Sequence, residues 1–324
     1  MPKTAIITGI TGQDGAYLSQ LLLEKGYRVV GLTRSYSSSN TERLQYLGIE
    51  KEVILQGCEV TDFSQLFKVF KTYEPTEIYN LAAQSSVSLS FRQPIGTIKF
   101  NIISVLNLLE SIRLFNPKIR FYQASSSEMF GKVAQLPITE REVFHPLSPY
   151  AISKASAHWI AINYREAYDL YTSCGVLFNH ESYLRSPNFF VKKVIAEAIR
   201  IHFGKQKELK VGNIEVKRDF GWAPKYVEAM YLMLQQEAAD DYLVCSGESL
   251  SLRSIIEHVF ERLSIPKEKI VIDPALFRPT DIEDIYGNSS KAKQQLGWDY
   301  EMSFYEVLDQ LIEEELRVMK TQDR

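Results

Sequence analysis

The chain has 324 residues, a length that fits about two domains of roughly 150 residues each. Hydrophobic residues make up 45% of it and charged residues 24%, which excludes a disordered chain because this much apolar surface can build a core. With 37 basic and 40 acidic residues the net charge is −3, so there is no electrostatic basis for expecting nucleic acid or an anionic membrane as a partner.

The first half of the chain alternates short apolar runs with amphipathic stretches of helical length. We expect buried parallel strands over residues 4–8, 27–32, 53–55, 77–81, 120–124 and 173–178. We expect helices between them over residues 17–25, 63–73, 98–115 and 150–168. Strands alternating with helices predict βαβ units and an α/β fold of Rossmann type, with a doubly wound parallel sheet.

After about residue 180 the pattern changes, because helical segments are separated by short strand-like pieces and proline turns. We expect helices over residues 190–203, 225–236 and 252–263. The last helix carries an apolar stripe at helical spacing, formed by Phe304, Val307, Leu308, Leu311 and Ile312. The acidic run at 313–315 is expected to face solvent. The chain thus predicts a cofactor domain over 1–180 and a smaller, mainly C-terminal α/β substrate domain over 181–324, with some segments returning to the first.

A glycine-rich turn, Gly9-Ile10-Thr11-Gly12-Gln13-Asp14-Gly15, separates the first expected strand from the first expected helix. Glycines there let the backbone approach a pyrophosphate, which the free N–H groups and the dipole of the helix N-terminus stabilise. The spacing is one residue longer than the usual dinucleotide-binding pattern, but its position in a βαβ unit makes it specific. A purely structural turn is the alternative.

The end of the second expected strand reads Gly31-Leu32-Thr33-Arg34 and has no carboxylate. An NAD site usually offers an acidic residue about 20 positions after the glycines, where it binds the ribose 2′-hydroxyl. A fixed cation at Arg34 suits the 2′-phosphate of NADP, so we predict NADP as the cofactor. A solvent-facing arginine is the alternative.

Two more segments follow strands at the edge of the sheet where folds of this type bind ligands. Glu59 and Val60 follow the third expected strand, and Glu59 is expected to accept a hydrogen bond from the adenine amino group. The small residues of Leu81-Ala82-Ala83-Gln84-Ser85, after the fourth, let the cofactor lie close.

The fifth expected strand ends in Ser125-Ser126-Ser127-Glu128, and Tyr150 and Lys154 follow on an expected helix. A tyrosine and a lysine four positions apart share one helix face. A lysine beside the Tyr150 hydroxyl favours the phenolate, so we expect the pKa of Tyr150 to fall below its usual value of about 10. Such a tyrosine acts as a general base near neutral pH, while a hydroxyl from the strand orients the substrate oxygen.

Motifs along the chain resemble those of the extended short-chain dehydrogenase/reductases: TGITGQDG, NLAAQS, SSSEMFG, SPYAISK and LFNHES. Within that superfamily the chain is similar to the GDP-mannose 4,6-dehydratases over nearly its whole length, including HWIAINYREAY, YVEAMYLMLQQ and FRPTDIEDIYGNSSKAKQQLGW. The resemblance implies an NADP-dependent lyase that acts on a nucleotide sugar, a GDP-hexose and most simply GDP-mannose. It also implies a homodimer or homotetramer.

The implied reaction is redox-neutral. Tyr150 takes the proton from the sugar O4 as hydride leaves C4 for the nicotinamide. Glu128 then removes the C5 proton, and water leaves from C6 with a proton from Glu128 or through Ser127. Return of the hydride to C6 and of a proton to C5 gives a 4-keto-6-deoxy sugar.

The resemblance assigns roles to the residues that match the motifs of the family. The catalytic set is Ser126, Ser127, Glu128, Tyr150 and Lys154. The cofactor-binding set is Thr8, Gly9, Thr11, Gly12, Gln13, Asp14, Gly15, Arg34, Glu59, Val60, Leu81, Ala82, Ala83, Gln84, Ser85, Tyr150, Lys154, His180 and Arg185. The substrate-binding set is Ser85, Ser126, Glu128, Asn179, Lys193, Arg218, Arg278 and Asp281. Arginine forks suit a diphosphate, and Asp281 is expected to accept from a ribose hydroxyl.

Several positions depart from the pattern of the family. Its usual catalytic threonine is Ser126 here, its usual aspartate after the third strand is Glu59, and its usual second arginine is Ser35, which bears on tetramer assembly. The usual Pro-x-Arg-Gly after HES reads Tyr183-Leu184-Arg185-Ser186-Pro187. That segment borders the substrate pocket in relatives, so another sugar, such as a GDP-heptose or GDP-N-acetylglucosamine, stays open.

Other functions on this fold are weighed against the dehydratase. A nucleotide-sugar epimerase or a 4-keto reductase would share the glycine turn and the Tyr150–Lys154 pair. Glu128 favours the dehydratase, since neither rival needs a carboxylate there for elimination. An NADP-binding protein without catalysis is disfavoured because Ser126, Tyr150 and Lys154 are all present.

The remaining polar and aromatic residues predict ordinary structural roles. Cys58, Cys174 and Cys245 lack the spacing of a disulfide framework or a zinc site, so we expect buried, reduced thiols in a cytoplasmic protein. No two histidines have metal-ligand spacing, so we expect no metal. We also expect no signal peptide and no membrane-spanning run of about 18 residues. Asp219 is expected to anchor a loop.

Overall fold

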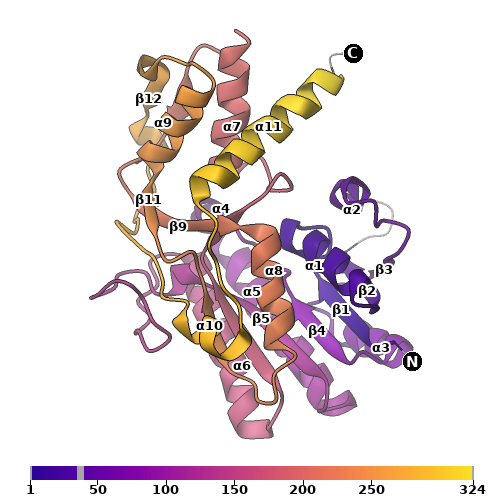
Figure 1. The fold of residues 1–324 in the computed structure, drawn as a ribbon. Coiled ribbons are helices and arrows are strands. Elements are labelled where there is room, and N and C mark those ends of the chain that lie inside the picture. Colours follow the sequence, from indigo (N-terminus) through magenta and orange to yellow (C-terminus); the bar gives the residue numbers. More distant parts are fainter. Residues whose placement is uncertain (1, 35–39, 323–324) are drawn as a thin grey trace.

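The structure is a computed structural model that describes residues 2–34 and 40–322 (Figure 1). Among these residues, seven parallel strands form the central sheet, in the order β3-β2-β1-β4-β5-β6-β10. The strands are β1 (Thr4–Thr8), β2 (Arg28–Thr33), β3 (Ile54–Gly57), β4 (Glu77–Asn80), β5 (Arg120–Ser126), β6 (Thr172–Leu177) and β10 (Asp241–Val244). The strand order reverses between β1 and β4, where doubly wound sheets bind ligands. The predicted α/β fold of Rossmann type is confirmed.

Helices cover both faces of this sheet. One face carries α3 (Phe63–Tyr73), α5 (Pro94–Phe115) and α6 (Pro149–Tyr168), and the other carries α1 (Gln13–Glu24), α8 (Ala223–Met233) and α10 (Ser290–Leu296). Adjacent residues of β1 face opposite cores, because Ile6 packs with the first set of helices and Ile7 with the second. Burial on both faces explains why the central residues of β1 are all apolar.

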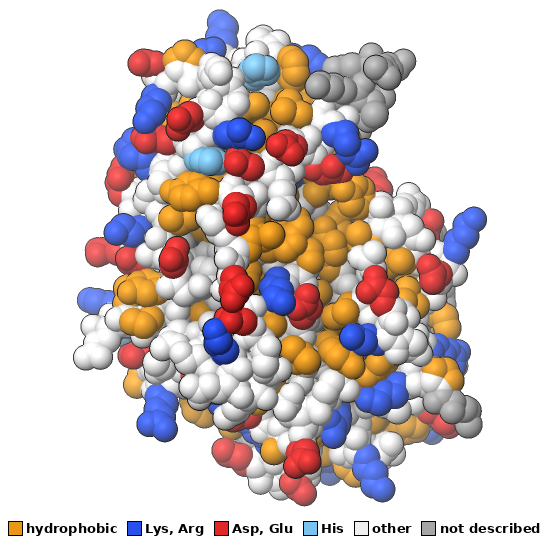
Figure 2. Space-filling model, in the orientation of Figure 1, with side chains coloured by type: hydrophobic (Ala, Val, Ile, Leu, Met, Phe, Trp, Pro, Cys, Tyr) orange, Lys and Arg blue, Asp and Glu red, His pale blue; other side chains and the backbone are white. Residues whose placement is uncertain are grey.

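A smaller set of layers lies above the carboxyl ends of the strands (Figure 1). Its strands are β7 (Asn179–Glu181), β9 (Lys217–Trp222) and β11 (Ser249–Ser251), which form one sheet, and the pair β8 (Leu209–Val211) and β12 (Ile270–Ile272). Its helices are α7 (Phe190–His202), α9 (Leu252–Arg262) and α11 (Phe304–Gln322). They enclose a separate core, in which the whole predicted apolar stripe of α11 is at most 6% exposed. On the face seen in Figure 2, apolar side chains gather where the two parts of the molecule meet.

The chain crosses between the two parts more than once. After β9 it returns to the central sheet, where α8 packs against α1 and β10 pairs with β6. It then forms β11, α9 and β12 above, comes back to α10, and ends in α11. The strand β10 therefore completes a sheet that the chain begins with β1 at Thr4.

Several elements differ from their predicted bounds. α1 begins at Gln13 instead of 17, and α5 begins at Pro94 instead of 98, with the proline in its first turn, where its missing N–H costs nothing. The sequence did not predict the short helices, because they have too few residues for a periodic pattern. These helices are α2 (Glu42–Tyr46), α4 (Val87–Arg92), α10, η1 (Ser127–Met129), η2 (Lys267–Lys269) and η3 (Pro274–Leu276).

Among the described residues, α5 is the one helix long and apolar enough to cross a membrane, by length and composition only. It packs beside α3 and α6, and a helix packed in a protein core meets the same criteria. The acidic run does not face solvent as a whole: the side chain of Glu313 is 72% exposed, but those of Glu314 and Glu315 are only 23% and 18% exposed. Ser35 lies outside the described residues.

Two predicted structural roles hold. All three cysteines are buried and free. Asp219, which is fully buried, accepts hydrogen bonds from the backbone and hydroxyl of Ser246 at 2.8 and 2.7 Å and from the Gly247 amide at 3.0 Å, so it does anchor a loop.

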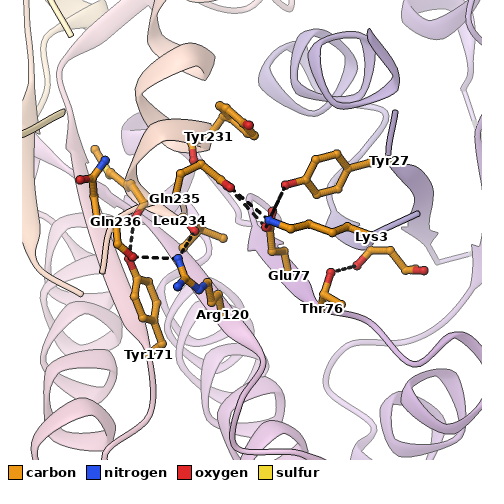
Figure 3. A network of polar contacts seen from close by, with 12 residues as sticks. Lys3, Tyr27, Thr76, Glu77, Arg120, Tyr171, Tyr231, Leu234, Gln235 and Gln236 are labelled. Atoms are coloured by element: carbon orange, nitrogen blue, oxygen red, sulfur yellow. Dashed lines mark hydrogen bonds and ion pairs between the residues drawn. The ribbon is translucent and has the colours of Figure 1, made fainter. Parts of the chain in front are cut away.

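A buried carboxylate organises the amino-terminal edge of the central sheet (Figure 3). Glu77 on β4 is 1% exposed and accepts from the Lys3 ammonium at 3.0 Å and from the Tyr27 hydroxyl at 2.9 Å. The Tyr79 hydroxyl donates to its second oxygen at 2.8 Å. Beside it, Arg120 donates to two backbone carbonyls just beyond α8, at 2.6 and 2.8 Å. This edge therefore fastens α8 to the sheet, at the opposite end from the predicted site.

Candidate functional site

The glycine turn leaves almost no room for side chains. Gly9 has φ +71°, and a Cβ added at Gly15 would lie 2.4 Å from the Gly9 carbonyl oxygen. The Gly12 amide donates to that same oxygen at 2.9 Å. α1 starts at Gln13, and among the described residues no side chain caps its first turn. The backbone N–H groups at the helix N-terminus thus form a tight cradle of the kind that fits a dinucleotide pyrophosphate.

Thr8 has a different role from the one predicted for it. Its side chain is fully buried, so its hydroxyl does not face the site. The hydroxyl donates to Asn80 at 2.7 Å and accepts from the amides of Leu81 and Ala82 at 3.1 and 3.0 Å. Asn80 in turn donates to Gln123 on β5 at 2.8 Å. Thr8 therefore positions the small-residue segment after β4 instead of binding the cofactor with its side chain.

Asp14 and His180 form a pair across the two parts of the molecule. The Asp14 carboxylate lies 2.9 Å from Nε2 of His180, while Nδ1 lies 2.7 Å from the Phe178 carbonyl oxygen. Burial raises the pKa of Asp14, but the charge and hydrogen bond of His180 outweigh burial and bring it to about 2. The pair fastens the start of α1 to β7.

The residues predicted around the adenine side lie at two neighbouring strand ends. Arg34 follows β2 directly and is exposed. Glu59 follows β3, but one of its carboxylate oxygens already accepts from the amide and the hydroxyl of Thr61 at 3.1 and 2.8 Å. Val60 is 5% exposed and packs in the core. Arg34 is thus the most exposed residue of this set, and Val60 can contact a ligand only through its backbone.

The segment after β4 is tied to the catalytic helix through a residue that the sequence did not single out. Asn101 of α5 accepts from the Gln84 amide at 2.8 Å and donates to the Ser153 hydroxyl at 2.9 Å. That hydroxyl donates to the Tyr150 carbonyl at 2.7 Å. The helix also carries Asn107 and other polar residues, so no sequence signal distinguished Asn101. Ser85, next to Gln84, is exposed.

The predicted catalytic residues come together at the end of β5. Ser126 ends that strand and Ser127 begins η1 directly after it. The hydroxyl of Ser148 caps α6 by accepting from a backbone amide at 3.0 Å, and this cap starts the helix that carries Tyr150 and Lys154. Ser126, Tyr150 and Lys154 are 8%, 7% and 6% exposed, so the group is almost enclosed by protein.

The predicted pKa shift of Tyr150 is wrong in direction. Burial raises the pKa of Tyr150 to about 12, although a hydrogen bond with Ser126 and the charge of Arg185 lower it. Burial also lowers the pKa of Lys154 to about 8. The Lys154 ammonium donates to the Ala124 carbonyl at 2.7 Å and lies 5.9 Å from the centre of the Tyr150 ring. Loss of solvation therefore outweighs the attraction that the sequence spacing suggested.

Glu128 meets the predicted substrate residues. One of its carboxylate oxygens lies 4.0 Å from Nε of Arg218 on β9. Arg218 is buried and also pairs with Asp281 at 2.6 Å and donates to the Ile282 carbonyl at 2.6 Å. Arg278 lies 3.5 Å from the same Asp281 oxygen. A chain of alternating charges therefore runs from the end of β5 to the segment beyond η3.

The remaining predicted residues have separate contacts. Asn179 donates to the backbone of β9 at 3.3 Å. Lys193 of α7 donates to the Lys210 carbonyl on β8 at 2.9 Å, and within the described part of the chain it touches none of the other candidates. Nε of Arg185 lies 3.4 Å from a carboxylate oxygen of Glu181. Burial raises the pKa of Glu181.

Known proteins resemble this chain over nearly its whole length. The profile of a family described as GDP-mannose 4,6 dehydratase matches residues 6–311. GDP-mannose 4,6 dehydratase 1 of Arabidopsis thaliana is 44% identical over 329 residues, covering 98% of this chain and 91% of that protein.

Solved structures share the fold at lower identity. UDP-glucose 4-epimerase of Thermotoga maritima, determined with UDP-glucose, has a TM-score of 0.87 at 24% identity and covers 98% of this chain and 99% of its own. dTDP-glucose 4,6-dehydratase of Bacillus anthracis, in complex with NAD, has a TM-score of 0.83 at 21% identity, with 96% of each chain covered.

Proposed function

The chain belongs to the GDP-mannose 4,6-dehydratase family, and on that premise we propose that it removes water from a GDP-linked hexose, GDP-mannose first among them. The observation that carries the proposal is the carboxylate at the end of β5. Glu128 follows Ser126 and Ser127 directly, and Tyr150 is hydrogen-bonded to Ser126. An elimination needs a carboxylate for the C5 proton in addition to a hydroxyl for the proton of O4.

In this proposal the residues of the chain handle the protons. Tyr150 takes the proton of the sugar O4, and Ser126 orients that oxygen. Glu128 removes the C5 proton, which the neighbouring ketone acidifies, and a proton from Glu128 or through Ser127 helps the C6 hydroxyl leave as water. A nicotinamide dinucleotide held at the glycine turn would supply the hydride chemistry for oxidation at C4 and for reduction at C6, where a proton must also return to C5. Because burial raises the pKa of Tyr150 to about 12, its deprotonation relies on nearby cations such as Arg185.

We propose NADP as the cofactor because the exposed cation Arg34 directly follows β2, where an NAD site usually presents a carboxylate. The glycine turn supports a dinucleotide of either kind, so Arg34 carries the distinction. In Arg34→Asp, the ratio of NADP to NAD affinity should fall by about tenfold or more, since a fork that fits a phosphate is replaced by a like charge. Wild-type protein that binds NAD as tightly as NADP would contradict this reading.

We propose that two copies of the chain associate through the outer face of α5 and α6. Large apolar side chains remain exposed there, including Ile95 at 82%, Leu114 at 54% and Trp159 at 58%. Trp159→Glu should convert the oligomer into monomers in analytical ultracentrifugation, whereas Val143→Glu, at an exposed apolar residue outside both helices, should not.

The test of the activity is a mass-spectrometric screen of GDP-, UDP-, CDP- and dTDP-linked sugars for loss of water. We expect a dehydrated product with GDP-mannose or another GDP-hexose, and none with the other nucleotides. Isomerisation without loss of water would instead identify an epimerase. The screen also resolves the effect of the altered segment 183–187 on the choice of sugar.

A further inference from the structure

Arg43 of α2 makes contacts that neither the sequence pattern nor the proposed reaction accounts for. Its guanidinium donates to the Thr11 carbonyl in the glycine turn at 2.9 Å. It also donates to the Leu184 carbonyl at 2.6 Å and to the Ser186 hydroxyl at 2.9 Å. A single half-buried side chain thus joins the cradle for the dinucleotide to the segment 183–186, which departs from the family pattern.

Tyr46 of α2 and Lys192 of α7 also contact the segment 183–186. The ring of Tyr183 stacks on Tyr46 of α2, with centroids 5.0 Å apart and planes 28° apart. The Lys192 ammonium of α7 lies 3.9 Å from the centre of that ring and donates to the Tyr183 carbonyl at 3.2 Å. Lys192 in turn pairs with Glu315 of α11 at 2.5 Å. The segment is therefore a bridge between α2 on the central sheet and the helices of the upper part.

The segment 183–186 lies close to residues of the proposed substrate and catalytic sites. The segment directly follows β7, which carries Asn179 and His180, and it contains Arg185, whose charge lowers the pKa of Tyr150. A shift of the segment would therefore move residues on the substrate side and beside the catalytic tyrosine. Arg43 contributes three of the hydrogen bonds that hold the segment beside the glycine turn. Gln13 and Asp14 add contacts to Ser182 and His180, just before the segment.

Only an arginine can make this set of contacts. Its planar fork reaches three separate acceptors, whereas a lysine is a point charge at the end of a flexible stem. All three acceptors are neutral oxygens on either side of the junction. The contacts therefore set geometry across the junction instead of neutralising a charge.

We propose that Arg43 is a positioning residue that couples the dinucleotide-binding turn to the segment 183–186, so that filling the cofactor site tightens binding of the substrate nucleotide. The proposal rests on the proposed function for the identity of the two ligands, but its test does not require turnover. By linkage, the same factor must appear when the nucleotide is added first.

The experiment measures the dissociation constant of GDP with and without saturating NADPH, by calorimetry on the full chain. In the wild type we expect NADPH to tighten GDP binding by a factor of about 5 to 150, the usual range of coupling between sites. In Arg43→Lys this factor should fall to near one, while NADPH alone still binds. Arg262→Lys, at an exposed arginine of α9 that pairs with α11, should keep the wild-type factor.

Ser186→Ala removes one of the three acceptors without threatening the fold, and its coupling factor should lie between those of the wild type and Arg43→Lys. A factor near one in the wild type, or an unchanged factor in both variants, overturns the proposal. Failure of the proposed function is a separate result. If no GDP-hexose is dehydrated but coupling is present and lost in Arg43→Lys, only the activity is wrong.

Discussion

The two edges of the central sheet both bury charged and polar groups, but they use them differently. At the amino-terminal edge Glu77 is surrounded by donors from Lys3, Tyr27 and Tyr79, so its network is closed (Figure 3). At the carboxyl edge Tyr150 and Lys154 are also buried, but in the described part of the chain neither forms an ion pair with a carboxylate, and burial moves their pKa values to about 12 and about 8. At the amino-terminal edge the buried groups satisfy one another's hydrogen bonds, which stabilises the fold. At the carboxyl edge burial shifts the pKa values of the two groups that we assign to proton transfer.

We therefore expect mutations at the carboxyl edge to lower activity and mutations at the amino-terminal edge to lower stability. Tyr150→Phe should lower turnover by about 10²–10⁴-fold, the usual contribution of a general acid–base group. The ring and Lys154 stay in place, so the thermal midpoint and cofactor affinity should change little. Steady-state kinetics and a thermal melt on the same preparation check both parts, and near-normal turnover would remove Tyr150 from the mechanism.

At the opposite edge, Glu77→Ala should cost about 3 kcal/mol of unfolding free energy, because it leaves buried hydroxyls and a lysine without their acceptor. Turnover per folded molecule should stay at the wild-type level well below the melting temperature. Glu77→Gln, which keeps the size and one acceptor, should cost less. A loss of turnover without a loss of stability would contradict the division between the edges.

The pair of Asp14 and His180 gives a smaller and pH-dependent effect. The pKa of Asp14 in the folded protein is about 2, below its ordinary value of 3.8, so its contribution is present above pH 3.8 and is lost as the pH falls through 2. The contribution is about 2 kcal/mol. Denaturant unfolding at pH 7 and at low pH should show that Asp14→Asn loses less stability on acidification than the wild type. Glu313→Gln, at a carboxylate 72% exposed, should follow the wild type.

The features that sequence predicts well are those with a local signature. The glycine turn lies between β1 and α1 because its spacing is set within seven residues, and Tyr150 and Lys154 share a helix because four positions make one turn. The apolar stripe of α11 is buried because its period alone fixes the inward face.

The features that sequence misses depend on distant segments. Arg43 contacts Leu184 and Ser186, which lie more than 140 positions later in the sequence, and Glu315 contacts Lys192 across 123 positions. No local sequence pattern predicts either contact. The direction of the pKa shift of Tyr150 was also missed, since spacing shows which groups are near but not how far packing removes them from water.

The most direct test of the account is the fate of substrate in Glu128→Gln, because glutamine keeps the shape of the side chain but takes up no proton at neutral pH. With GDP-mannose and the NADP-loaded variant we expect oxidation at C4, seen as reduced-nicotinamide absorbance. Little dehydrated product should form, and exchange of the C5 hydrogen with deuterated solvent should fall in parallel. Glu128→Gln that dehydrates its substrate at close to the wild-type rate would contradict the central claim that this carboxylate drives the elimination.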